Sequence, residues 1–119
     1  MLLQTERGIR IEERLFAPGE TLHAPHLIDI EVAHAMCRAW LQGLIDEVRA
    51  GEALDDLAAW SLIRYPHDLF LPRIWSIRHN VTAYDAVYVA LAESLEVILL
   101  TCDARLASSS GHDARIEIA

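Results

Sequence analysis

A chain of 119 residues, 53% of them apolar, is long enough to bury one hydrophobic core and too apolar to remain disordered. Its formal net charge of −8 gives no overall basic field for coating nucleic acid, but it leaves open a nuclease whose charge balance depends on bound metal. All its Lys and Arg positions are Arg, and the lack of lysine excludes a P-loop ATPase and Schiff-base catalysis.

The predicted elements alternate between helix and strand along a single domain that spans residues 1–119. Apolar spacing predicts a first helix over 2–16, and Pro25, which lacks an N–H, suits the first position of a second helix. The other segments are listed here in chain order: strand 21–24, helices 25–40 and 47–59, strand 60–64, helices 68–78 and 82–95, strand 97–101, loop 108–111 and strand 115–118. Strands that alternate with helices indicate an α/β fold with a mostly parallel sheet.

The sequence contains no pattern for a disulfide, a zinc site or a membrane span. Cys37 and Cys102 are isolated, without a CxxC pair, so we expect neither a structural disulfide nor a thiolate zinc site. No apolar run reaches the ~18 residues of a membrane span. Polar residues at 5–7 interrupt the apolar start, which is not typical of a signal peptide. We therefore expect a cytoplasmic protein with no membrane partner.

Three acidic residues, Glu31, Asp85 and Asp103, lie in or directly after apolar runs. A carboxylate next to buried surface is costly unless a positive or hydrogen-bonding group compensates it. If folding brings the three together, a divalent cation is the simplest compensation, and hard ions such as Mg²⁺, with Mn²⁺ as a second option, prefer oxygen ligands. Asp103 follows a predicted strand, and ligands of parallel sheets bind beyond the carboxyl ends of the strands.

Each of these acids also has a structural alternative. Thr82 and Asp85 fit a capping box at the start of a helix, where a negative charge favours the helix dipole. Asp103 is suited to cap the turn that follows it, and Glu31 fits a solvated helix face. Asp29, on the adjacent face of the same helix, is interpreted as a surface residue. The joint pattern, more than any single acid, favours a metal site.

Three stretches carry a resemblance to a known family: TAYDAVYVALAE at 82–93, LLTCDARL at 99–106 and APHLIDIEV at 24–32. With them the chain resembles the PIN-domain nucleases, and among these the VapC-like toxins of type II toxin–antitoxin systems. The resemblance implies a three-layer α/β domain and a Mg²⁺-dependent endoribonuclease. It also implies that Glu31, Asp85 and Asp103 are catalytic metal-site acids and that Thr101 is an auxiliary polar group.

The chain differs from the family pattern at its start. PIN domains begin with an apolar strand that ends in Asp and lies in the middle of the sheet, whereas residues 1–8 are similar to the helix after that strand. We therefore expect an N-terminally truncated PIN-like domain without the first, central strand and its Asp, with a weakened metal site. A start codon placed too far downstream and a degraded gene are the two explanations, which the upstream genomic sequence distinguishes.

The resemblance also implies partners. RNA is the expected substrate, with Arg73, Arg78 and Arg105 as candidates for backbone contacts; the alternative for each is surface solubility or an ion pair with a nearby acid. A VapB-like antitoxin is expected to cover the acidic site, with helices 25–40 and 46–59 forming part of its groove, and homodimers are usual in the family.

Two other functions compete with the ribonuclease toxin. A catalytically impaired PIN remnant would only bind a partner protein. A phosphoacceptor signalling domain is also α/β with clustered Asp, but such domains resemble one another in using a Lys that this chain does not have.

Overall fold

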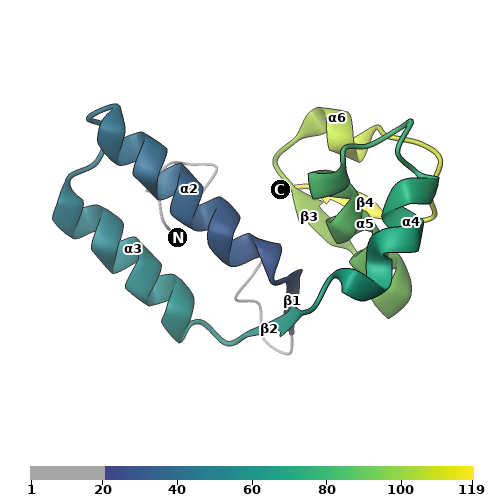
Figure 1. Ribbon diagram of the computed structural model, residues 1–119, viewed down its shortest axis with the longest axis horizontal. Coiled ribbons are helices and arrows are strands. Elements are labelled where there is room, and N and C mark those ends of the chain that lie inside the picture. The colour runs from purple at the N-terminus through teal and green to yellow at the C-terminus, as the bar shows by residue number, and fades with distance from the viewer. Residues whose placement is uncertain (1–20) are drawn as a thin grey trace. The chain divides into compact units, whose positions relative to one another are not determined.

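The computed structural model describes residues 21–119, and the chain divides into two units, the first ending at Arg64 and the second running from Tyr65 to Ala119 (Figure 1). The helix predicted over 2–16 lies outside the described residues. Among the helices of the described range, none combines the length and the apolar composition that crossing a membrane requires.

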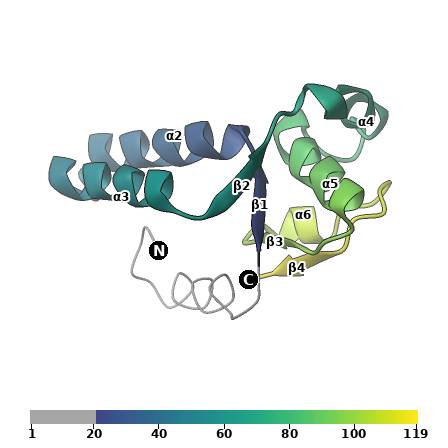
Figure 2. The ribbon, with the colours of Figure 1, turned by 90° about the horizontal axis from the view of Figure 1, so that it is seen from below.

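The described part of the first unit, from residue 21 on, holds two strands and two helices. Its elements are β1 (Leu22–Pro25), α2 (Leu27–Leu41), α3 (Glu47–Ala59) and β2 (Leu62–Tyr65). The strands pair as a two-stranded sheet, and the two helices lie side by side (Figure 2). The Asp46 carboxylate starts α3 by accepting a hydrogen bond of 2.7 Å from the Arg49 backbone N–H.

The start of α2 corrects the sequence prediction. Pro25 is the last residue of β1 instead of the first residue of the helix, and His26 is the N-cap. The proline ring disfavours the helical conformation of the residue before it, so Ala24 stays extended and the strand continues through Pro25. The helix therefore begins two residues later than expected.

The second unit contains the remaining elements. They are the 3₁₀ turn η1 (Asp68–Phe70), α4 (Leu71–Ser76), α5 (Ala83–Leu95), β3 (Leu99–Thr101), α6 (Ala104–Ala107) and β4 (Ile116–Ile118). The sequence predicted one helix over 68–78, but the structure splits it into η1 and α4. Pro72 lies in the first turn of α4, where its missing N–H is tolerated; within one continuous helix, it would interrupt the hydrogen bonding.

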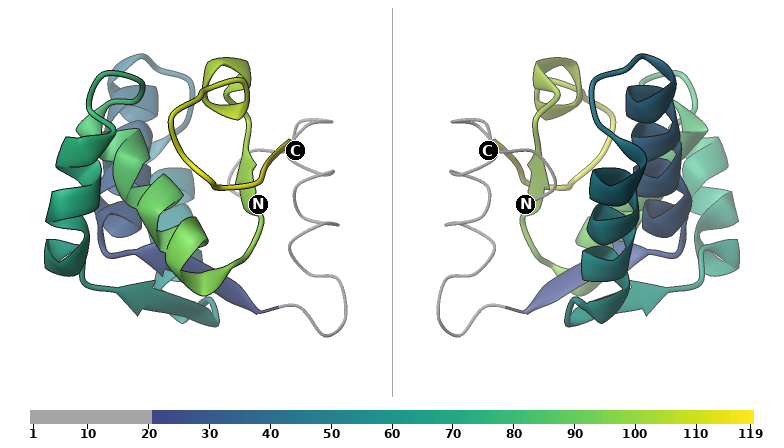
Figure 3. Two further views of the ribbon diagram at one scale, coloured as in Figure 1. Left: turned by 90° about the vertical axis from the view of Figure 1, so that its right-hand side faces the viewer. Right: turned by 90° about the vertical axis from the view of Figure 1, so that its left-hand side faces the viewer.

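A small apolar core holds the second unit together. Helices α4 and α5 pack against each other, and α5 also contacts β3 (Figure 3). The buried side chains of this core are Ile77, Val81, Ala86, Val89 and Leu106, with Ile74, Leu99, Ala114 and Ile116 packed against them. Because this core joins both helices to both strands, it fixes where α5 begins relative to the end of β3.

The strands agree in part with the expected sheet. In residues 21–119 they form two pairs, β1 with β2 and β3 with β4. The second pair is parallel, with Leu99 opposite Ile116 and Thr101 opposite Ile118. The α/β class is confirmed, and β3–β4 provides the parallel pairing that the alternating pattern predicted.

Candidate functional site

Asp85 lies in the first turn of α5. Thr82 is the N-cap, and its hydroxyl oxygen accepts a hydrogen bond of 3.3 Å from the Asp85 backbone N–H. The predicted cap is therefore present, but it uses the main chain of Asp85. In the described part of the chain, the half-buried Asp85 carboxylate has no hydrogen-bond partner. The capping role consequently leaves both carboxylate oxygens available for a ligand.

Asp103 is held directly beyond the carboxyl end of β3 by two hydrogen bonds. Its backbone N–H donates to the Thr101 hydroxyl at 3.0 Å, and one of its carboxylate oxygens accepts from the Arg105 backbone N–H at 2.9 Å. Asp103 is thus the N-cap of α6, as the structural alternative predicted. These bonds orient the exposed carboxylate and use only one of its two oxygens.

Glu31 belongs to the other unit. It lies on α2 and is exposed to solvent, whereas Asp85 and Asp103 both belong to the second unit. Within the described part of either unit, no three His, Cys, Asp or Glu side chains are grouped closely enough to hold a metal ion. The structure therefore brings Asp85 and Asp103 into one unit, and the complete set of three acids stays a prediction.

The three candidate arginines have different environments. Arg73 forms a two-pronged ion pair with Glu93, at 2.9 Å from Nε and 2.7 Å from Nη2, which is the alternative considered for it. The Arg78 guanidinium lies 4.2 Å from the centre of the Trp75 ring and donates to the Trp75 carbonyl at 2.8 Å. The Arg105 guanidinium makes no hydrogen bond or ion pair with residues 21–119. Arg78 and Arg105 thus keep donors available for a phosphate.

Glu93 is an acid that the sequence did not single out. Its carboxylate accepts from Arg73 and, at 2.8 Å, from the Asp113 backbone N–H, and its side chain is 15% exposed. The Arg73 hydrogen bonds hold the pKa of Glu93 below its ordinary value of 4.5, against the opposing effect of burial. The only sequence signal for the pair of Arg73 and Glu93 is that their opposite charges lie on neighbouring predicted helices, 20 residues apart. This signal is weak.

This pKa shift predicts an acid-sensitive stability. A depressed pKa in the folded state means that ionised Glu93 stabilises the fold above about pH 4.5, and that this stabilisation is lost as pH falls through the lower folded-state value. Replacement by Gln should cost about 1–2 kcal/mol at pH 7, because it removes a charged, mostly buried hydrogen-bond acceptor. Urea unfolding of both proteins between pH 7 and 3 measures this difference. A difference that stays constant across this range would contradict the prediction.

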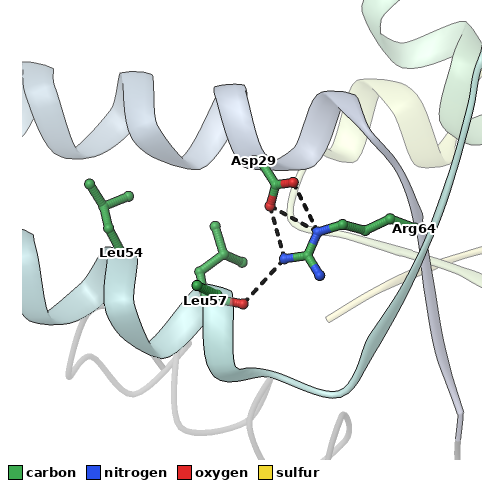
Figure 4. A pocket seen from close by; sticks show the side chains of 5 residues that line it. Asp29, Leu54, Leu57 and Arg64 are labelled. Carbon is green, nitrogen blue, oxygen red and sulfur yellow. Dashed lines mark hydrogen bonds and ion pairs between the residues drawn. The ribbon is translucent and has the colours of Figure 1, made fainter.

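Asp29, interpreted from the sequence as a surface residue, is partly exposed and also forms an ion pair across the first unit. Its carboxylate binds Arg64 of β2 at 2.9 Å from both Nε and Nη2, and Nη2 also donates to the Leu57 carbonyl at 3.2 Å (Figure 4). The pair lines an open pocket of about 410 Å³ together with Leu54, Leu57 and Ala58. Because the two charges neutralise each other, this pocket offers no net charge for a metal ion or a phosphate.

Comparison with known proteins identifies the family. The PIN domain model matches residues 2–110. Ribonuclease VapC1 of Mycobacterium tuberculosis is 50% identical over 100 residues, covering 81% of this chain and 73% of that protein. Ribonuclease VapC12 of the same organism is 39% identical over 118 residues, covering 99% of this chain and 90% of that protein. VapC ribonuclease Mb0985 of Mycobacterium bovis is 39% identical over 98 residues, which is 82% of this chain and 77% of that protein.

The matched region contains all three acids singled out in the sequence, and the similarity to VapC12 extends over almost the whole chain. The fold described above is the mixed α/β arrangement that the resemblance implied. On this similarity of sequence and fold, the chain belongs to the PIN-domain family and, within it, to the VapC-like proteins.

Proposed function

We propose that this protein is a divalent-metal-dependent endoribonuclease and the toxin of a VapBC-type toxin–antitoxin system. The observation that carries the proposal is the 50% identity over 100 residues with a protein named as a VapC ribonuclease. The capping geometry supports it, because Asp85 and Asp103 keep carboxylate oxygens available in the same unit.

The proposed metal ligands are Glu31, Asp85 and Asp103. Their donors are all carboxylate oxygens, which suit Mg²⁺ or Mn²⁺ better than a thiol-preferring ion, so the chemistry of the donor set fits the group that the family implies. When bound, such an ion supplies charge neutralisation at the phosphate and a hydroxide near neutral pH.

The residues of the chain have separate roles in this proposal. Asp85 would hold the metal, and Asp103 would hold a second ion or act through water. Glu31 either binds metal or orients the attacking water as a general base. Thr101, which accepts the backbone N–H of Asp103, fixes that acid beyond β3. Arg78 and Arg105 hold the RNA backbone through their remaining N–H donors, while Arg73 is engaged by Glu93.

The proposed partners are a VapB-like antitoxin and a second copy of the chain, and the proposed location is the cytoplasm. Helices α2 and α3 and their connection expose large apolar side chains that suit an antitoxin groove: Ile30, Trp40, Leu41, Leu44 and Val48. A second exposed group, Leu69, Leu71 and Trp75, lies along η1 and α4 and suits contact between two copies.

The test is RNA cleavage by the purified protein with Mg²⁺, with Mn²⁺ and with EDTA. We expect cleavage only with metal, and its recovery when excess Mg²⁺ is added back to the EDTA sample. The same assay on a chain extended at its N-terminus by an apolar strand ending in Asp tests whether a further acid strengthens the metal site. If neither protein shows metal-dependent cleavage but both bind the antitoxin, the nuclease proposal would have to give way to the partner-binding alternative.

A further inference from the structure

We propose that Glu93 is a positioning residue that links α4, α5 and the segment before β4 into one rigid support for Asp85 and Asp103. The inference rests on the proposed function, since it concerns two of the acids proposed to hold the metal. Glu93 itself stays outside the chemistry and acts through the elements that it joins.

Three hydrogen-bond donors converge on the Glu93 carboxylate. Glu93 projects from the C-terminal half of α5 and accepts from Arg73 of α4 through both oxygens. One of these oxygens also accepts the backbone N–H of Asp113, which precedes β4. A single side chain therefore connects three segments, and charge-assisted bonds of this kind are about twice as strong as neutral ones.

Strand β4 holds the end of β3. The parallel register places Thr101 opposite Ile118, and the Ala119 backbone N–H donates to the Thr101 carbonyl at 2.8 Å. Asp103 is bonded to Thr101 in turn. Any change in where β4 begins is therefore transmitted along the strand pair to the position of Asp103.

The segment before β4 also makes a close contact near the beginning of α5. Gly111, in the segment before β4, has a φ of +86° and lies so close to the Asn80 side chain that an added Cβ would collide with it. Asn80 comes two residues before Thr82, the N-cap of the helix that carries Asp85. The segment at 111–113 is thus fixed near both the beginning and the later turns of α5.

Separation along the elements shows why Glu93 is not itself a ligand. It lies eight residues after Asp85 on one helix, which corresponds to roughly 12 Å at the helical rise. Asp113 precedes β4 and Asp103 follows β3, so in the parallel register the two residues lie beyond opposite ends of the strand pair. An effect of Glu93 on the acids must pass through the framework.

The experiment compares Glu93→Gln with Glu96→Gln, a matched control at an exposed position at the end of the same helix. Amide hydrogen exchange is measured at a pH and temperature where both variants are folded. We expect Glu93→Gln to accelerate exchange at Asp113 and also at the distant Asp103 and Arg105 amides, which are hydrogen-bonded in the structure. Arg73→Gln, which keeps the Asp113 bond, is the milder second variant and should produce a smaller change at the same amides.

Mn²⁺ binding measured by calorimetry provides the second measurement. Glu93→Gln should weaken the metal affinity by at least about tenfold, as loss of supporting residues around metal ligands typically does, while Glu96→Gln leaves it unchanged. Faster exchange confined to Asp113 and its neighbours, with unchanged Mn²⁺ affinity, would overturn the proposal. If neither the wild-type protein nor the N-terminally extended chain binds metal or cleaves RNA, but Glu93→Gln still loosens Asp103, the nuclease function is refuted and the positioning role stays intact.

Discussion

Replacing Asp85 with Asn should lower metal-dependent RNA cleavage by about a thousandfold, equivalent to about 4 kcal/mol in the reaction barrier. Asn has almost the same size but carries no charge, and it is a poorer ligand for a hard divalent ion. The fold should be retained, because Thr82 caps α5 through the backbone N–H of residue 85, which the substitution preserves. The loss should therefore be one of chemistry with little unfolding.

Initial cleavage rates at saturating Mg²⁺, combined with thermal unfolding, measure both parts of this expectation. The control is Asp68→Asn, the same substitution at an exposed acid of the second unit, which should change neither activity nor stability appreciably. Wild-type activity in the Asp85 variant would remove this residue from the metal site. A collapse of stability would instead assign the carboxylate a structural role.

The second large effect is expected in the core of the second unit. Ile77→Ala should destabilise the protein by about 3 kcal/mol, because the side chain is 2% exposed and its removal leaves a cavity among Val81, Val89 and their neighbours. Ile118→Ala deletes the same atoms at a position that is 54% exposed and should cost less than about 1 kcal/mol.

Urea unfolding of the two variants at neutral pH measures the difference. Similar losses at both positions would mean that Ile77 is not in a closely packed core. Because this core joins α5 to β3, we also expect Ile77→Ala to reduce cleavage at temperatures near the unfolding midpoint, in proportion to the folded fraction.

Local signals predicted much of the fold. The α3 helix runs over 47–59 as expected, since an Asp at the cap position and helix-favouring residues decide its limits within the segment itself. The start of α5 follows from Thr82 in the same way. The errors occurred at two prolines: Pro25 continued a strand, and Pro72 divided a predicted helix into a 3₁₀ turn and a short α-helix.

Contacts between distant segments were harder to foresee. Asp29 and Arg64 are 35 residues apart, and Arg73 and Glu93 are 20 apart, so only the packing of helices and strands brings these charges together. The caps at Asp85 and Asp103 were foreseen because cap and partner lie within three residues. Glu31 belongs to the other unit, so its part in the metal site stays a prediction.

At the start of α5, the backbone and the side chain of Asp85 have separate roles. Folding uses the peptide group of residue 85, whereas the proposed hydrolysis uses only its side chain. A single nucleotide change at this codon could therefore silence the toxin and still yield a well-folded polypeptide. Such an inactive protein would still bind the antitoxin. In a cell that also carries an active allele, it would leave less antitoxin to inhibit the active protein.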